Sequence, residues 1–283
     1  MSSPAVQPLL ALLACPVGGN PTQYMVEKAF AELDLDWRYL TFEVAAEDLA
    51  DAVRGLRALG FGGAHCAAPH KQAIIPLLDR TSETAAAVGA VNLIRREQNA
   101  LVGENTEGRG AMQAVAAHFD PAGKHVVLLG AGRLARAIAL ELLAVKVASL
   151  TIVNRTESRA AELAAMLAEK SADAPVSVVV WQGNFAVPPE TELLIHATSF
   201  ASGDDDAPLP LAVESLRPGL CVADAAWDVA QTRLLGDAHA RGCKTIDGLD
   251  MFIEQVAIGL RLWTDVDTDR QVMREAAEEF LGL

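Results

Sequence analysis

The sequence has few basic residues, few cysteines and no long apolar run, and each scarcity excludes a class of protein. The 283-residue chain has 23 Lys and Arg against 37 Asp and Glu, so its formal net charge is −14, and the basic residues form no cluster. Binding to a phosphate backbone depends on clustered Lys and Arg. Nucleic acid is therefore not an expected partner.

The four cysteines have neither metal-like nor paired spacing. Cys15, Cys66, Cys221 and Cys243 are far apart, so we interpret them as buried, reduced thiols. The three aspartates at 204–206 lie among Ser, Gly and Pro, and we interpret them as solvated turn residues instead of metal ligands. No metal site is expected.

No stretch of the sequence is apolar for long enough to cross a bilayer. Glu141 and Lys146 interrupt the richest stretch, whereas a spanning helix needs about 20 mostly apolar residues. The run 9–15 ends at a cysteine, as a lipoprotein signal does, but the first basic residue is Lys28. We interpret this run as a buried first strand of a cytoplasmic protein with no membrane partner.

The sequence does have the pattern of an α/β protein with two domains. With 51% hydrophobic residues, 283 residues are enough for two ordinary domains with a substantial core. Before residue 110, apolar runs alternate with helical patterns, which predicts a largely parallel sheet with right-handed crossovers. The expected strands are 9–17, 38–44 and 61–67, the expected helices are 21–33 and 47–59, and a small hairpin is expected over 91–102.

The second half of the sequence predicts a doubly wound parallel sheet of the Rossmann type. We expect residues 1–110 to form an N-terminal α/β substrate domain, and residues 111–247 a C-terminal dinucleotide-binding domain after a linking helix over 110–119. Two helices within 248–283 are expected to pack back on the first domain and leave a cleft between the domains. The expected strands are 126–129, 150–153, 176–181, 193–197, 221–225 and 244–246.

A glycine-rich turn between a buried strand and a helix predicts a dinucleotide site. Glycine at 130 and 132 lets the backbone approach a pyrophosphate, and the N–H groups of the first helical turn meet the phosphates. A small residue at 135 lets the helix lie against the strand. The turn consists of Gly130, Ala131, Gly132, Arg133, Leu134 and Ala135.

The second strand of this unit ends on Asn154 and Arg155, followed by Thr156 and Arg159. An NAD enzyme usually presents an acid there to the ribose 2′-hydroxyl, whereas a guanidinium matches a phosphate in a bidentate manner. The pattern favours NADP(H) over NAD(H). Alternatively, the two arginines form a solvated face at a helix start, although helix starts favour acids; Glu157 could also neutralise one of them.

Seven segments, in order along nearly the whole chain, resemble the shikimate dehydrogenase family. Its members are NADP-dependent oxidoreductases that reduce 3-dehydroshikimate to shikimate. The segments are Ala68-Pro69-His70-Lys71, Gly89-Ala90-Val91-Asn92, Gly103-Glu104-Asn105-Thr106-Glu107-Gly108, Gly130 to Ala135, Asn154-Arg155-Thr156, Ala197-Thr198-Ser199, and the run from Gly248 to Gln255 that contains Met251.

The resemblance implies a catalytic pair, Lys71 and Glu107. Lys71 would serve as the acid/base for the reacting hydroxyl, and Glu107 would orient it and bind that hydroxyl. Asn92 and Gln255 match family residues that hydrogen-bond the substrate's hydroxyls. Without the resemblance, Lys71 and Gln255 would be interpreted as surface residues and Asn92 as a strand-end turn residue.

The resemblance also implies cofactor contacts from Thr198, Ser199 and Met251, in addition to the turn and arginine residues named above. The expected cofactor is NADP(H), and the expected partner is a small cyclic hydroxy acid. We expect the protein to be a monomer or a homodimer.

The departures from the family pattern all fall on the substrate contacts. A Ser-x-Ser-Pro segment that grips the substrate carboxylate is replaced by the serine-free segment 17–21, and Asn-x-Thr becomes the segment starting at His65. Trp227 stands where the family has a tyrosine, and Glu107 stands where the family has its catalytic aspartate. A displacement of about 1 Å can cost on the order of 100-fold in rate. A site that loses several hydrogen-bonding groups rejects the original substrate, so we predict an altered pocket with substrate contacts from His65 and Trp227.

Three functional interpretations remain open at this point. The leading one is an NADP(H)-dependent oxidoreductase that acts on shikimate or a related cyclic hydroxy acid. The alternatives are an NAD-dependent dehydrogenase of the quinate/shikimate type and a nucleotide-binding sensor with little catalysis. The presence of Lys71, Asn92, Glu107 and Gln255 favours an enzyme, because a sensor needs none of them.

Overall fold

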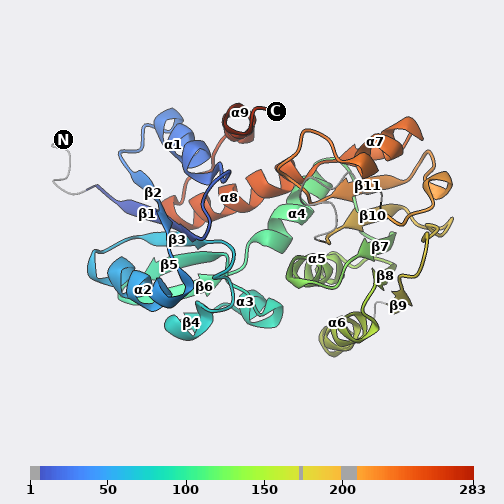
Figure 1. The fold of residues 1–283 in the computed structure, drawn as a ribbon, viewed down its shortest axis with the longest axis horizontal. Helices are drawn as coiled ribbons and strands as arrows, with labels where there is room; N and C mark the ends of the chain where they lie inside the picture. The colour runs from blue at the N-terminus through green and yellow to red at the C-terminus, as the bar shows by residue number, and fades with distance from the viewer. Residues whose placement is uncertain (1–6, 172–174, 199–208) are drawn as a thin grey trace. The chain divides into compact units, whose positions relative to one another are not determined.

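The computed structural model describes residues 7–171, 175–198 and 209–283. The chain forms two compact units: unit 1 comprises Met1–Thr106 with Gln255–Leu283, and unit 2 comprises Glu107–Glu254. Each unit contains a six-stranded sheet with helices (Figure 1). The predicted α/β class is confirmed. Ser199 and the aspartates at 204–206 lie outside the described residues.

Unit 1 contains a mixed sheet in the order β2-β1-β3-β5-β6-β4. β2, β1 and β3 are parallel, whereas β5 pairs antiparallel with both β3 and β6. The predicted parallel sheet and the predicted hairpin are thus parts of one sheet. The elements are β1 (Leu9–Ala14), α1 (Thr22–Glu32), β2 (Arg38–Glu43), the 3₁₀ turn η1 (Ala46–Asp48), α2 (Leu49–Ala58), β3 (Gly63–Cys66), the 3₁₀ turn η2 (Ile75–Leu77), β4 (Arg80–Thr81), α3 (Glu83–Val88), β5 (Leu93–Glu97), β6 (Ala100–Glu104) and α9 (Arg270–Leu281).

The short helix α3 was not predicted from the sequence, because its six residues are too few to show a helical periodicity. Its ends nevertheless carry ordinary capping signals. Ser82 accepts a hydrogen bond from the N–H of Ala85 at 3.2 Å, and Gly89 ends the helix with a φ of 71°. The segment that leads to Asn92 therefore begins at a well-defined helix end.

Helices lie on both faces of the unit 1 sheet. On one face, α2 packs its Val53 and Leu56 over Leu13 and Ala64. On the other face lie α1 and α9, which contact each other, and the later part of α8 (Gly248–Thr264), where Trp263 donates its indole N–H to the carbonyl of Ile94 at 2.9 Å. This second face carries the polar cluster described below.

Unit 2 has a fully parallel sheet in the order β12-β11-β10-β7-β8-β9. This is the doubly wound order, with the reversal between β7 and β10, so the predicted Rossmann-type sheet is confirmed. The eight-residue α7 was not predicted from the sequence. The elements are α4 (Glu107–Ala116), β7 (His125–Leu129), α5 (Arg133–Ala144), β8 (Ser149–Asn154), α6 (Glu157–Lys170), β9 (Val176–Val180), β10 (Leu193–His196), the 3₁₀ turn η3 (Val213–Ser215), β11 (Cys221–Asp224), α7 (Arg233–Ala240), β12 (Lys244–Ile246) and the start of α8.

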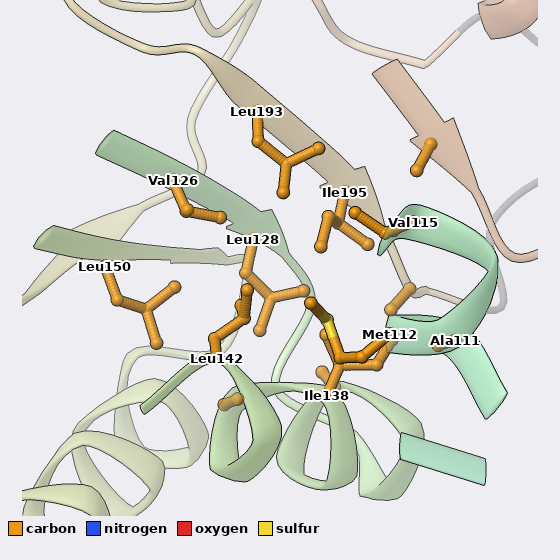
Figure 2. Packing of buried hydrophobic residues seen from close by; sticks show 14 of the residues in the cluster. Ala111, Met112, Val115, Val126, Leu128, Ile138, Leu142, Leu150, Leu193 and Ile195 are labelled. Carbon is orange, nitrogen blue, oxygen red and sulfur yellow. The ribbon is translucent and has the colours of Figure 1, made fainter. Parts of the chain in front are cut away.

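The core of unit 2 lies between the sheet and the helices α4, α5 and α6. Figure 2 shows Met112 and Val115 of α4 and Ile138 of α5 packed toward Leu128 and Ile195 on the central strands. Each fully buried side chain of this size contributes roughly 1.5–3 kcal/mol. α7 covers the opposite face. The central strands are thereby fixed, and their carboxyl ends meet along one edge of the sheet.

The contact between α4 and α5 depends on the absence of a side chain at Gly108, where a Cβ would collide with the carbonyl of Ala137. We expect Gly108→Ala to lower the free energy of unfolding by about 1–3 kcal/mol, measured by urea denaturation. Gly236→Ala in α7 is the matched control, because its Cβ would approach no atom closer than 3.9 Å, and we expect it to be neutral or stabilising by about 0.5–1 kcal/mol. Equal effects of the two substitutions would contradict this packing argument.

Candidate functional site

Unit 2 contains a cavity of ≈ 430 Å³ along the carboxyl ends of its strands. Residues that directly follow or end β7, β8, β9, β10 and β11 all contribute to its wall, as expected for a ligand site in a doubly wound sheet. The lining residues are Gly130, Ala131, Gly132, Arg133, Leu134, Asn154, Arg155, Thr156, Arg159, Trp181, Ala197, Thr198, Pro210, Ala225, Ala226, Trp227 and Asp228.

The glycine-rich turn forms part of the wall of this cavity. Gly130 has a φ of 120°, and a Cβ there would lie 2.6 Å from the carbonyl oxygen of Ala197, so the fold itself requires glycine at 130. Gly132, at the N-cap of α5, has ordinary extended backbone angles, and a Cβ there would meet no atom within 4 Å. The fold does not require glycine at 132. The open space beside its backbone fits a ligand that approaches the N-terminus of α5.

The cavity is basic although the protein is acidic. Among the described residues of its wall, Arg133, Arg155 and Arg159 are cationic and Asp228 is acidic. Glu157 is not among the described lining residues. The two arginines predicted to bind a phosphate thus face the same cavity as the glycine turn, which favours that interpretation over a merely solvated helix face.

Two further residues of the predicted cofactor set lie in the core. Ala135 is fully buried, as its predicted packing role requires, and Met251 is 6% exposed within the hydrophobic cluster of unit 2. Met251 is not among the described lining residues, so its cofactor contact stays a prediction. Ser199 lies outside the described residues.

Trp227, predicted to contact the substrate, forms part of the wall of this cavity. Its ring stacks on Phe252 with the centroids 4.5 Å apart and the planes 15° apart. Stacking fixes one face of the indole against α8, so the ring is held as a rigid wall.

A buried polar pair, which the sequence analysis missed, lies at the end of two neighbouring strands. His196 ends β10 and Asp224 ends β11, and His196 Nδ1 lies 2.8 Å from Asp224 Oδ1. His196 Nε2 lies 2.6 Å from Thr198 Oγ1, and Thr198 lines the cavity. Apolar strands that each end on a polar residue were the available signal, since parallel neighbours bring their carboxyl ends to the same edge.

In unit 1, the predicted substrate residues Asn92 and Gln255 come together although they are 163 positions apart. Asn92 Nδ2 donates to Thr106 Oγ1 at 2.9 Å and to Gln255 Oε1 at 3.2 Å, and Asn92 Oδ1 accepts the N–H of Thr106 at 2.8 Å. Asn92 is 4% exposed and Gln255 is partly buried. Gln255 is therefore not the exposed residue that its sequence context alone would indicate. Asn92 does lie in a bend just before β5, but it is buried.

The two family-like segments around this cluster are held together by tight packing. A Cβ at Gly103 would lie 2.6 Å from the side chain of Val91, and Asn105 Nδ2 donates to the carbonyl of Ala90 at 3.1 Å. The resemblance at 89–92 and 103–106 thus corresponds to one packed unit that positions Asn92 and Thr106.

Lys71 is tied to the same region through its backbone. The N–H of Val91 donates to the carbonyl of Lys71 at 2.8 Å, and the imidazole of His70, buried before it, lies 2.8 Å from the carbonyl of Val44. The Lys71 side chain is partly buried. Glu107 is the first residue of α4 and belongs to unit 2. The pairing of Lys71 with Glu107 stays a prediction.

His65 is a buried histidine on the α8-facing side of β3. Its Nδ1 lies 2.7 Å from the hydroxyl of Tyr39, its ring lies edge-on to Trp263, and its Nε2 has no hydrogen-bond partner among the described residues. Burial, and next the positive charge of Lys71, lower the pKa of His65 to about 3. Since Lys71 acts on the His65 imidazole electrostatically, the two residues share one environment.

The part of the chain that the structure describes contains no group of three His, Cys, Asp or Glu side chains that could hold a metal ion. None of its helices is both long enough and apolar enough to span a bilayer. None of the four cysteines, all of which lie in the described part of the chain, forms a disulfide. Cys15 is partly exposed, which corrects the prediction that it is buried, because it lies just beyond β1. Burial raises the pKa of the Cys221 thiol to about 11.

Comparison with known proteins places these features in one family. Residues 12–94 match the shikimate dehydrogenase substrate binding domain, residues 113–180 match shikimate/quinate 5-dehydrogenase, and residues 248–278 match the shikimate 5′-dehydrogenase C-terminal domain. A shikimate dehydrogenase (NADP(+)) of Moorella thermoacetica is 41% identical over 97% of this chain and 94% of its own length.

Two solved structures share the fold along nearly the whole chain. The ligand-free 5-ketofructose reductase of Gluconobacter sp. strain CHM43 has a TM-score of 0.93 and 40% identity, covering 97% of this chain and 99% of that protein. Shikimate 5-dehydrogenase of Thermus thermophilus, in complex with NADP(H) and shikimate, has a TM-score of 0.85 and 29% identity, covering 97% and 100%. The resemblance predicted from the seven segments is confirmed, and the chain belongs to the shikimate dehydrogenase family of oxidoreductases.

Proposed function

We propose that this protein is an NADP(H)-dependent oxidoreductase that interconverts a ketone and a hydroxyl on a small polyhydroxylated substrate other than shikimate. The cavity at the carboxyl ends of the unit 2 strands carries the cofactor part of this proposal. It combines the glycine turn, the N-terminus of α5 and three arginines. Relatives named for NADP(+) and the NADP(H) complex of the Thermus thermophilus enzyme support the same cofactor.

Each part of the cavity matches a part of the dinucleotide. The backbone of Gly130 to Gly132 and the first turn of α5 would hold the pyrophosphate, and Arg155 and Arg159 would hold the 2′-phosphate. NADPH supplies a hydride to the substrate carbon when bound. The protein must supply the proton and must orient the substrate.

Lys71 is the proposed proton donor for the oxygen that becomes the hydroxyl, and Glu107 is proposed to orient it. The Asn92 cluster supports a role in substrate orientation. Asn92 donates one amide hydrogen to Thr106 and the other to Gln255 Oε1. The Gln255 carboxamide is therefore held with its oxygen toward Asn92. The Gln255 amide nitrogen is then turned away from Asn92 and can donate to a substrate oxygen. A direct contact from Asn92 itself stays a prediction.

The segment 17–20 supports a substrate without a carboxylate. Asn20 Oδ1 accepts the N–H of Thr22 at 3.0 Å and its hydroxyl at 2.6 Å, so the Asn20 side chain is used to start α1. The N–H of Val17 donates to the carboxylate of Glu43 at 3.0 Å. The segment that matches the carboxylate-binding segment of the family is therefore hydrogen-bonded to an acid, Glu43 of β2. The negative charge of Glu43 repels an anionic substrate group.

His65 adds an uncharged polar group to this altered site. Its low pKa means that the imidazole stays neutral at physiological pH, so it offers hydrogen bonding without a charge to attract a carboxylate. A neutral polyhydroxy ketone fits these features, and the similarity to a 5-ketofructose reductase supports that class. Shikimate or a related cyclic hydroxy acid is the second candidate, supported by the relatives named for shikimate.

The finer properties of the enzyme also stay proposals. The NAD-dependent and sensor alternatives are less favoured, because the cavity wall carries the two predicted phosphate-binding arginines and unit 1 carries an ordered polar cluster. A cytoplasmic location and a monomeric or homodimeric state stay predictions from the sequence.

Arg155→Asp tests the cofactor assignment. We expect the dissociation constant of NADPH to rise roughly 10- to 100-fold, because a charge-assisted pair with the 2′-phosphate is replaced by repulsion, while NADH binding changes little. Fluorescence titration with both nucleotides measures this. Arg241→Asp is the matched control, since Arg241 is exposed in the same unit and is not among the described residues that line the cavity. Unchanged NADPH affinity in Arg155→Asp would remove Arg155 from the phosphate site.

Lys71→Met tests the catalytic assignment. With NADPH, we expect the wild-type protein to reduce 5-ketofructose with a kcat/KM at least about 100-fold above that for shikimate oxidation with NADP(+). We expect Lys71→Met to lower kcat by roughly 10²- to 10⁴-fold without changing the NADPH dissociation constant. Shikimate turnover equal to that of 5-ketofructose would overturn the altered-substrate proposal, and full activity in Lys71→Met would overturn the role of Lys71.

His65 gives a pH prediction for stability. Its folded pKa of about 3 lies below the unfolded value near 6.5, so the unfolded state binds the additional proton between these values and stability falls as pH drops through this window. Between pH 7 and pH 5, we expect the wild type to lose about 2 kcal/mol more than His65→Gln, which keeps a hydrogen-bonding group but does not titrate. Urea denaturation at the two pH values measures the difference, and parallel losses would contradict the prediction.

A further inference from the structure

The buried pair His196–Asp224 has no part in the function proposed so far. The two residues are 1% and 2% exposed, and Asp224, His196 and Thr198 are hydrogen-bonded in series, with Thr198 on the wall of the cavity. Burying two titratable groups is costly unless each is hydrogen-bonded. Here both side chains are hydrogen-bonded, and the series of hydrogen bonds ends at the Thr198 hydroxyl on the wall of the cavity.

The direction of the hydrogen bonds follows from the acceptor at one end. Asp224 Oδ1 also accepts the N–H of Ala226 at 3.2 Å, so the same oxygen is an acceptor toward His196, and His196 Nδ1 carries the proton. In the neutral imidazole, Nε2 is then an acceptor. With that tautomer, Thr198 donates its hydroxyl hydrogen to His196, and the hydroxyl oxygen keeps acceptor capacity toward other groups, a ligand among them.

The position of Thr198 indicates which half of a dinucleotide it would meet. Arg155 follows β8, in the half of the sheet formed by β7, β8 and β9, whereas His196 and Asp224 end strands of the other half. In a doubly wound sheet each half binds one mononucleotide. Since the 2′-phosphate side belongs to the adenosine, Thr198 belongs to the nicotinamide side. It lies directly at the reversal of strand order, because a Cβ on Gly130 would be 3.1 Å from Thr198 Cγ2.

We propose that Asp224 and His196 are positioning residues that fix the Thr198 hydroxyl as a hydrogen-bond acceptor for a donor on the nicotinamide half of NADP(H). The possible donors are the carboxamide N–H₂ and the ribose hydroxyls. This inference rests on the proposed cofactor. It assigns a role to two residues that do not line the cavity, and it requires the bond from Thr198 to His196 and not merely a polar residue at 198.

The test compares a whole cofactor with a fragment. NADPH and adenosine 2′,5′-bisphosphate, which lacks the nicotinamide half, are titrated against the wild type, Thr198→Val, Thr198→Ser and His196→Leu. We expect Thr198→Val and His196→Leu to weaken NADPH binding roughly 3- to 10-fold and to leave fragment binding unchanged. Thr198→Ser keeps the hydroxyl and should bind like the wild type.

His196→Asn is the conservative variant, and it guards against loss of folding in His196→Leu. Its amide can donate to Asp224 from the place of Nδ1 but is too short to replace Nε2 at Thr198, so we expect NADPH binding to weaken as in His196→Leu while the protein stays folded. The double variant His196→Leu/Thr198→Val should bind NADPH no more weakly than Thr198→Val alone, because both substitutions remove the same interaction.

A 3-acetylpyridine analogue of NADPH, which lacks the carboxamide N–H₂, identifies the donor. An effect of Thr198→Val that disappears with the analogue indicates the carboxamide, and an effect that persists indicates a ribose hydroxyl.

Three results would overturn the proposal. The first is NADPH binding by Thr198→Val and His196→Leu within twofold of the wild type. The second is an equal loss of fragment and cofactor binding, which would indicate a structural role only, and the third is an additive loss in the double variant. A wild-type protein that bound neither NADPH nor the fragment would overturn the proposed function itself, together with this inference.

Discussion

The close approach of Gly130 to the end of β10 is the constraint on which the nucleotide cavity depends. A single Cβ at 130 would lie 2.6 Å from the Ala197 carbonyl, so the turn after β7 and the end of β10 can meet only with glycine there. That contact occurs at the reversal of strand order, where a doubly wound sheet leaves a crevice. The cavity, the N-terminus of α5 and the Thr198 hydroxyl all follow from it.

The charge of the cavity is opposite in sign to the net charge of the protein. The chain carries a net charge of −14, yet three arginines and one described acid line the cavity. A basic cavity in an acidic protein concentrates an anionic ligand at one place and leaves the rest of the surface unattractive to polyanions. Unit 1 shows the opposite arrangement near segment 17–20, where the carboxylate of Glu43 holds the N–H of Val17. These arrangements support the proposed combination of an anionic cofactor with an uncharged substrate.

Hydrogen-bond direction limits what each polar cluster can recognise. In unit 1, the backbone N–H of Thr106 fixes the orientation of the Asn92 amide, which in turn orients Gln255. In unit 2, the N–H of Ala226 fixes Asp224 as an acceptor, which in turn directs His196 and Thr198. In both cases a backbone N–H, which can only donate, determines whether a side chain two hydrogen bonds away donates or accepts.

The α/β class, the parallel strands of unit 2, the glycine turn, the family and the arginines of the cavity could all be predicted from the sequence. Each of these depends on a local pattern, such as hydrophobic periodicity, a turn that needs glycine, or the residues at the end of a strand. The sequence did not reveal α3 and α7, which are too short for a periodic signal, or the pair His196–Asp224. That pair, the contact of Asn92 with Gln255 and the position of His65 Nε2, which has no hydrogen-bond partner among the residues described, depend on the tertiary structure. Such features arise where strands and helices distant in the chain pack together, and no local pattern encodes which buried polar groups will then face each other.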